Sequence, residues 1–269
     1  MPIPRIYHTE AIVLSRFELG EADRVLTLLT PHDGKLKAIA KGVRRPRSRL
    51  GGSLEPFAEL YLVLARARTF DVITSASVGH AWLSLRDRLE STATAWYLAE
   101  LAERAVEERA FAYPVYALLR RAYQLLDDGM APGRVARWYE FGLADALGMR
   151  PEVERCVECD RVLEADEEFR WVPLLGGTMC SRHLPPPSEQ SPLSLGALKL
   201  LRAYRRLDIE AIAGLRLPVA VESEVESALR RFIRTVLERE ARSLAFLDEV
   251  RAHRPLVGVI DASPAETRQ

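Results

Sequence analysis

Three cysteines and one histidine stand in two pairs that share the same spacing. Two residues separate Cys156 from Cys159, and two separate Cys180 from His183. In a zinc knuckle, two such ligands flank a tight turn, and Zn²⁺ takes four nitrogen or sulfur ligands in a tetrahedron. All three cysteines of the chain belong to this pattern. It therefore predicts one structural zinc ion in a reducing compartment rather than a disulfide framework.

The signals of catalysis are absent. Four protein ligands leave no open position at the metal for a catalytic water, and the deaminase motifs H-x-E and P-C-x-x-C do not occur. The only Gly-Lys pair, Gly34-Lys35, is followed by Leu36, so there is no P-loop for nucleotide phosphates. Neither a Ser-His-Asp arrangement nor a defined pair of carboxylates stands out. We expect a protein that is not an enzyme.

A run of positive charge forms the second signal. The basic segment, residues 35–49, contains no acidic residue, and Gly42, Pro46 and Ser48 predict a loop in its second half. Its cations are Lys35, Lys37, Lys41, Arg44, Arg45, Arg47 and Arg49. The formal net charge of the chain is +0, so nucleic-acid affinity must come from such a local cluster. The pattern favours a phosphate clamp; the alternative is a solvated loop that only aids solubility.

A weaker basic patch lies near the C-terminus. Its members are Lys199, Arg202, Arg205, Arg206, Arg230, Arg231 and Arg234. Acidic residues at positions 222, 224, 226 and 238 make a salt-bridged helix surface an equally good interpretation. Trp82, Trp96 and Trp138 stand among aliphatic residues and are predicted to belong to a core rather than to stack on bases.

The first 80 residues have the texture of a small barrel. Five short segments rich in aliphatic and β-branched residues are predicted strands, at 11–14, 24–30, 35–41, 58–65 and 71–78. Asp33-Gly34 marks a hairpin turn between the second and the third. In residues 35–41, Leu36, Ala38 and Ala40 share one face. We predict a five-stranded OB-type barrel over residues 1–80.

Residues 81–254 are predicted to form a helical domain that contains a zinc-binding segment at 152–188. Leu85 and Leu89 continue a stripe between Trp82 and Trp96, Pro114 can open the next helix, and residues 133–147 form a third. Two more helices follow the zinc segment, the second with a capping box at Ser223 and Glu226. Residues 255–269 are typical of a flexible tail. No apolar run approaches a membrane span and no secretory signal opens the chain, which favours a soluble, cytoplasmic protein.

Particular strings resemble one family. Residues 20–30 (GEADRVLTLLT), 34–50 (GKLKAIAKGVRRPRSRL) and 55–57 (EPF) resemble the N-terminal domain of bacterial RecO proteins. Residues 148–159 (GMRPEVERCVEC) and 176–183 (GGTMCSRH) resemble the zinc segment of the same family. The parts follow the same order over about residues 6–247. The resemblance implies an α+β multidomain protein, with an OB-fold barrel followed by a helical domain that carries the zinc site.

The resemblance also implies a function. RecO proteins act in recombinational DNA repair, bind single- and double-stranded DNA, and anneal complementary strands without ATP. They engage the acidic tail of single-strand-binding protein and, with RecR, help load the recombinase RecA. It implies that the basic segment contacts DNA and that the cytoplasmic protein joins the nucleoid during repair. Two positions depart from the family pattern: Asp160 stands where Gly often follows the second cysteine, and His183 stands where Cys is common.

Two other functions fit parts of the pattern. OB barrels and zinc knuckles also serve RNA-binding or transcription-associated modules. A metal-dependent nucleic-acid hydrolase would need an open metal position and a general base, which the sequence does not offer. For the acidic partner tail, we expect a groove in the helical domain, where cations are available on helices rich in aliphatic residues. These cations are Arg120, Arg121, Arg134 and Arg137.

Overall fold

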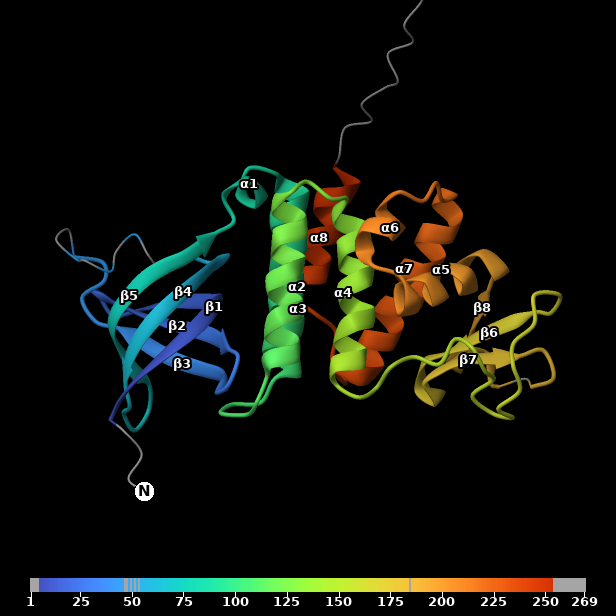
Figure 1. Ribbon diagram of the computed structural model, residues 1–269, viewed down its shortest axis with the longest axis horizontal. Helices are drawn as coiled ribbons and strands as arrows, with labels where there is room; N and C mark the ends of the chain where they lie inside the picture. The colour runs from blue at the N-terminus through green and yellow to red at the C-terminus, as the bar shows by residue number, and fades with distance from the viewer. Residues whose placement is uncertain are drawn as a thin grey trace, which may run out of the picture.

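The computed structural model describes residues 5–45, 48, 50, 52, 54–183 and 185–253. A β-barrel, a bundle of helices and a small lobe with three short strands follow one another along the long axis (Figure 1). The predicted tail at 255–269 lies outside the described residues. Within them, no helix combines the length and the apolar character that crossing a membrane requires.

The barrel closes in the strand order β1-β2-β3-β5-β4. Its strands are β1 (Ile6–Leu19), β2 (Asp23–Thr30), β3 (Gly34–Ala40), β4 (Ala58–Ala65) and β5 (Asp71–Ala81). Neighbouring strands are antiparallel, except that β3 and β5 run parallel where they close the barrel. The predicted five-stranded barrel of the OB type is confirmed.

Alternation along β3 separates the barrel core from the charged surface. Leu36, Ala38 and Ala40 are buried in the barrel core, as predicted. Lys35 and Lys37 are on the opposite side of the strand, because successive side chains of a strand point to opposite faces. Ile39 shares the face of the lysines but is only 9% exposed, at the point where β3 pairs with β5.

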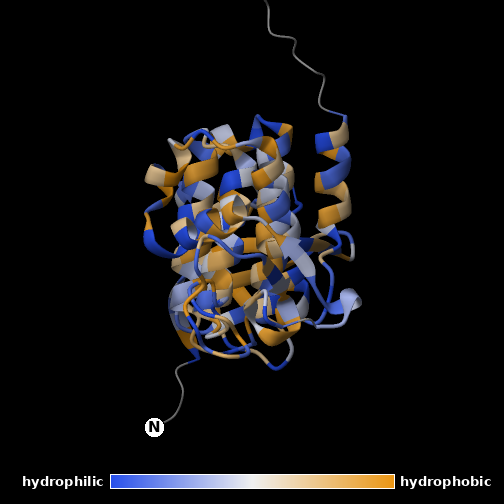
Figure 2. Cartoon of the chain, turned by 90° about the vertical axis from the view of Figure 1, so that its right-hand side faces the viewer, coloured by the Kyte–Doolittle hydropathy of each residue, from blue (hydrophilic) through white to orange (hydrophobic). Residues whose placement is uncertain are grey.

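The described helices stand between the barrel and the lobe. They are α1 (Leu83–Arg86), α2 (Leu89–Ala105), α3 (Tyr113–Asp127), α4 (Pro132–Ala146), α5 (Leu195–Arg206), α6 (Ile209–Ala213), α7 (Val219–Val236) and α8 (Ser243–Ala252). Hydrophobic and hydrophilic residues alternate along them (Figure 2), as in helices that bury one side. Pro114 and Pro132 lie in the first turns of α3 and α4, where a missing N–H costs nothing.

The predicted apolar stripe from Trp82 to Trp96 does not belong to one helix. Arg88 is extended, with φ −117° and ψ 113°, and separates α1 from α2. Its guanidinium donates to the carbonyls of Leu126 and Asp127 at the end of α3. A long-range contact therefore interrupts a locally continuous pattern. The tryptophans do pack against the core, as predicted.

The predicted capping box at Ser223 and Glu226 is wrong. α7 begins at Val219, after Pro218, so Ser223 lies within the helix. Glu226 is instead ion-paired with Arg137 in the bundle interior. The short helices α6 and α8 were not predicted; α6 packs against α4 and α5, and α8 packs against α2.

The lobe contains a small sheet that was not predicted. β6 (Phe169–Val172) lies between β7 (Gly177–Cys180) and β8 (Ser191–Leu193), and two 3-10 turns, η1 (Pro173–Leu175) and η2 (Pro187–Glu189), complete the lobe. Trp171 of β6 is fully buried, and its indole N–H donates to the Ala228 carbonyl of α7 at 2.9 Å. The sheet is therefore anchored in the core of the bundle.

The barrel and the bundle are joined by backbone as well as by side chains. The loop before α3 runs along β3: the N–H of Lys35 donates to the Glu107 carbonyl, and the N–H of Arg109 donates to the Lys35 carbonyl. Gly34, at φ +58°, allows this approach, since a Cβ there would lie 2.4 Å from the Ala110 carbonyl oxygen.

A buried carboxylate reinforces the junction. Asp71 of β5 accepts hydrogen bonds from the Tyr7 hydroxyl at 2.5 Å and the Arg109 guanidinium at 2.6 Å. Burial disfavours its charged form, but these donors outweigh burial and hold the pKa of Asp71 below its usual value. Burial and the same contact raise the pKa of Tyr7 to about 12.

Candidate metal centre and nucleic-acid interface

The structure brings the four predicted metal ligands together. One ligand atom from each of Cys156, Cys159, Cys180 and His183 lies within 4.8 Å of the other three. The His183 Nδ1 is 3.3 Å from the Cys180 Sγ and 3.8 Å from the Cys156 Sγ. The Sγ atoms of Cys159 and Cys180 are 4.0 Å apart. Ligand atoms around a tetrahedral zinc are separated by about 3.5 to 3.8 Å, so this donor set fits one such ion.

Two turns position the ligands. The first pair lies in a knuckle closed by hydrogen bonds from the Cys156 N–H to the Arg161 carbonyl and from the Asp160 N–H to the Cys156 carbonyl. Asp160 has φ +57°, which explains why glycine suits this position in the family and why aspartate, which tolerates the left-handed region, can replace it. Cys180 ends β7, and a turn follows in which the His183 N–H donates to the Cys180 carbonyl.

The backbone stabilises the thiolate form of the buried ligand. The N–H of Cys180 donates to the Cys156 Sγ at 3.4 Å. Burial raises the pKa of the Cys156 thiol, but N–H donation from Cys180, Cys159 and Glu158 outweighs burial and lowers the pKa below its ordinary value. Because the thiolate is the form that binds metal, this environment prepares the site for a cation.

The basic segment divides into anchored and unpartnered cations. The Lys35 Nζ donates to the Glu103 carbonyl of α2 at 2.6 Å. Arg44 forms an ion pair with Glu18 at 3.1 Å, so it is less available than the loop pattern predicted. The remaining described cations are Lys37, Lys41 and Arg45. Each is exposed, and none has an ion pair or side-chain hydrogen bond to another described residue.

Two contacts anchor the loop that follows β3. The N–H of Gly42 donates to the Asp23 carboxylate at 2.7 Å, which fixes the point where the chain leaves β3. Val43 is buried in the barrel core, so the loop is anchored between its exposed cations. Arg47 and Arg49, also predicted to bind DNA, lie outside the described residues.

The weaker basic patch is largely neutralised by acids. Arg202 and Arg206 pair with Glu154, and Arg205 lies 3.8 Å from Glu152, so these cations attach α5 to the lobe. Lys199 is exposed. The interpretation as a salt-bridged surface is therefore correct for α5. On α7, Arg230 is paired, whereas Arg231 and Arg234 have no ion-pair partner in the part of the chain that the structure describes.

The arginines predicted to be available for an acidic partner tail are engaged within the protein. Arg137 is 4% exposed and pairs with Glu140 and Glu226. The others also form ion pairs: Arg120 with Glu59, Arg121 with Glu210, and Arg134 with Glu222. The prediction of four free cations was therefore wrong. Helical position alone does not show which acids the fold brings alongside.

Comparison with known proteins establishes the relationship of this chain. Residues 3–82 match the family described as recombination protein O, N terminal, and residues 86–245 match that described as recombination protein O, C terminal. DNA repair protein RecO of Roseiflexus sp. (strain RS-1) is 40% identical over 247 residues, covering 92% of this chain and 87% of that protein. DNA repair protein RecO of Dehalococcoides mccartyi (strain CBDB1) is 33% identical over 251 residues, covering 93% and 98%. The chain belongs to the RecO family.

Proposed function

We propose that this protein is a recombination mediator in DNA repair. Its relatives are DNA repair proteins, and their names support a role in repair and recombination. The observation that carries the molecular part is a group of three exposed cations, Lys37, Lys41 and Arg45, that have no ion-pair partner among the described residues. They lie on the barrel of a chain that has no net charge. These cations bind the phosphates of single- and double-stranded DNA.

Strand annealing follows from this kind of contact. Base pairing supplies the free energy, so the protein needs no ATP and no catalytic group. It neutralises phosphates while the bases stay accessible, because phosphate contacts carry no base information. The metal centre has a structural role, since three cysteines and one histidine complete the coordination of one zinc ion.

The family resemblance supplies the partners. The protein engages the acidic tail of single-strand-binding protein through the helical half and acts with RecR to help load RecA. It does so in the cytoplasm, at the nucleoid during repair. The test compares binding of this protein to full-length single-strand-binding protein and to a version without the acidic tail. Equal binding to both would show that the tail is not the contact.

The central test is annealing of complementary strands coated with single-strand-binding protein, in the absence of ATP. Changing Lys37, Lys41 and Arg45 to Gln should abolish annealing and weaken binding of bare strands. Each phosphate contact on a single strand contributes about 0.7 to the slope of log affinity against log salt, so the slope should fall by about 2.

The matched control removes three exposed charges elsewhere, at Arg150, Lys199 and Arg216. It should anneal DNA normally, because none of these three residues lies in the basic segment. If the barrel variant is folded and anneals at the wild-type rate with the wild-type salt slope, the proposed DNA surface is wrong. Tighter binding to RNA than to DNA of equal length, without annealing, would favour the RNA-binding alternative.

A further inference from the structure

A second group of unpartnered cations lies at and beyond the C-terminal end of α7. We call Arg231, Arg234, Arg239 and Arg242 the arginine ridge. Three of them are exposed and Arg231 is half-buried, and none of their guanidinium groups has an ion pair or hydrogen bond to another described residue. Their neighbour Arg230 differs, because its guanidinium binds both carboxylate oxygens of Asp248 and also contacts Glu226. Arg230 is therefore neutralised, whereas the guanidinium groups of the ridge have no described carboxylate as an ion-pair partner.

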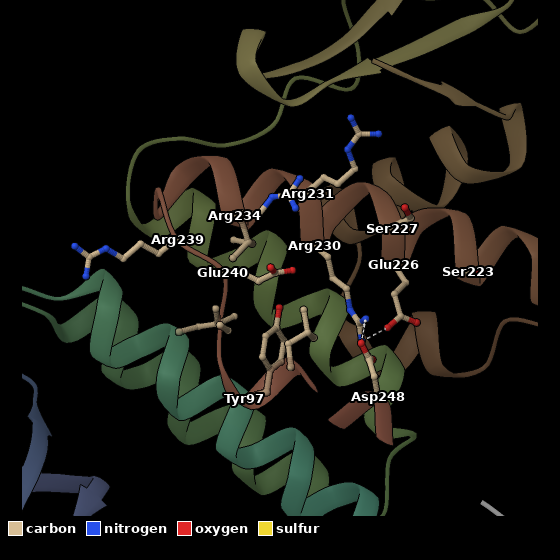
Figure 3. A pocket seen from close by; sticks show the side chains of 14 residues that line it. Tyr97, Ser223, Glu226, Ser227, Arg230, Arg231, Arg234, Arg239, Glu240 and Asp248 are labelled. Atoms are coloured by element: carbon tan, nitrogen blue, oxygen red, sulfur yellow. Dashed lines mark hydrogen bonds and ion pairs between the residues drawn. The ribbon is translucent and has the colours of Figure 1, made fainter. Parts of the chain in front are cut away.

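The ridge borders a cavity of about 370 Å³ between α7, α2 and α8. Arg230 points into this cavity and meets Asp248, whereas Arg231 and Arg239 point away from Asp248 in two other directions (Figure 3). The guanidinium groups fan out along the rim instead of converging on one point. Such an arrangement suits a ligand with charges repeated along its length better than a single small anion.

The ridge continues toward the barrel. Arg239 also borders a second cavity, of about 770 Å³, together with Arg242 and Lys35 of β3. Lys35 and Lys37 share the outer face of β3, and Lys41 follows this strand. The two cavities and the strand surface thus connect the basic segment with α7 across the junction of barrel and bundle.

Among the acids beside this path, Glu100 is engaged within the protein, whereas Glu238 and Glu240 are exposed and their carboxylates pair with no described residue. Glu100 accepts hydrogen bonds from the Ser243 hydroxyl and from the backbone N–H groups of Arg242 and Ser243, and it pairs with Arg104. Burial raises the pKa of Glu100, but these donors outweigh it and lower the pKa, so the carboxylate stays charged and satisfied. Glu240 points into the first cavity, away from the outward-facing arginines (Figure 3).

We propose that the arginine ridge is the second half of one extended binding track for a nucleic-acid single strand. The strand starts at the basic segment, crosses the junction beside Lys35 and reaches α7. Guanidinium groups on the rim bind successive phosphates, and the cavities give sugars and bases room. This inference rests on the proposed function, and it adds that the helical half binds the same strand as the barrel.

Dependence on strand length tests the track. In the ridge variant all four arginines are changed to Gln, and binding is measured by fluorescence anisotropy with oligonucleotides of about 6 and about 30 nucleotides; one OB barrel covers about 4–16 nucleotides. The long strand should lose about 3 from its salt slope, because four contacts each contribute about 0.7. Between about 50 and 200 mM salt, that slope corresponds to a change in affinity of about 50-fold. The short strand, held by the basic segment, should bind as in the wild type.

A control variant with Gln at Arg121, Arg150, Lys199 and Arg216 removes the same charge from other surfaces of the helical half. It should bind both strands with wild-type slopes. The track is wrong if the ridge variant binds the long strand normally, or if it weakens short and long strands equally. The track is also wrong if the ridge variant binds DNA normally and loses only its affinity for an acidic peptide, since the ridge would then be a protein-binding surface. A different variant tests the proposed function itself. If that function is wrong, the variant with Gln at Lys37, Lys41 and Arg45 binds both the short and the long strand as the wild type does.

Discussion

The metal centre offers a sharp test through its histidine. We expect His183→Ala to lose the zinc ion and His183→Cys to retain it, because the His183 Nδ1 lies 3.3 Å from the Cys180 Sγ, where a thiolate can replace it. A ligand that binds only the folded state stabilises it by about 4 kcal/mol when the free ligand concentration is about 1,000 times the dissociation constant. Loss of zinc should therefore lower the free energy of unfolding by about that amount.

The packing predicts which parts of the protein lose stability when zinc is lost. Cys156 and Cys180 belong to the same hydrophobic core as Trp171 and Ala228, so the lobe and α7 should be destabilised together. The interior of the barrel has a separate core and should be affected less. Elemental analysis measures zinc per chain, and hydrogen exchange compares the sheet β6–β8 and α7 with strands β2 and β3.

Three outcomes would refute this reasoning. If wild-type protein purified without chelator contains no zinc, the four residues are not a zinc site under those conditions of expression. If His183→Ala retains a full complement of zinc while Cys156→Ser loses it, the fourth ligand is a different residue. Equal loss of exchange protection in barrel and lobe would contradict the division of the two cores.

Two further predictions concern the junction between barrel and bundle. Gly34→Ala should lower the free energy of unfolding, measured by urea titration, by about 2 kcal/mol or more, because φ is +58° and the new Cβ would meet the Ala110 carbonyl. Gly20→Ala is the control, because Gly20 has φ +62° but open space around it. Its cost in the same titration should be only about 1 kcal/mol. Similar costs at both sites would contradict the role assigned to the close approach. Because the pKa of Asp71 is lowered in the folded state, its contribution is complete above about pH 4, the range of an unfolded aspartate, and is lost as the pH falls through the folded pKa. The Asp71→Asn variant should be less stable than the wild type at neutral pH and should lose less stability on acidification; parallel curves would refute this.

The sequence determined those features whose signal is local. The four candidate metal ligands are paired at two-residue spacing within single turns, so the two halves of the site could be predicted before the structure showed that they meet. The strands of the barrel were predicted because alternation and a turn at Asp33-Gly34 are properties of neighbouring residues. The strings that resemble the RecO family then indicated the order of the parts.

The tertiary structure decided which charges are free. Arg44 and Arg45 are adjacent in a basic loop, yet Arg44 meets Glu18 of β1 and Arg45 meets no described acid. Arg230 and Arg231 are equally adjacent on α7, yet only Arg230 reaches Asp248 of α8. A guanidinium is neutralised by whichever carboxylate lies within about 4 Å, and that carboxylate can be far away in sequence. Composition and periodicity describe a residue and its chain neighbours, whereas ion pairing depends on how separate strands and helices pack, which only the folded chain specifies.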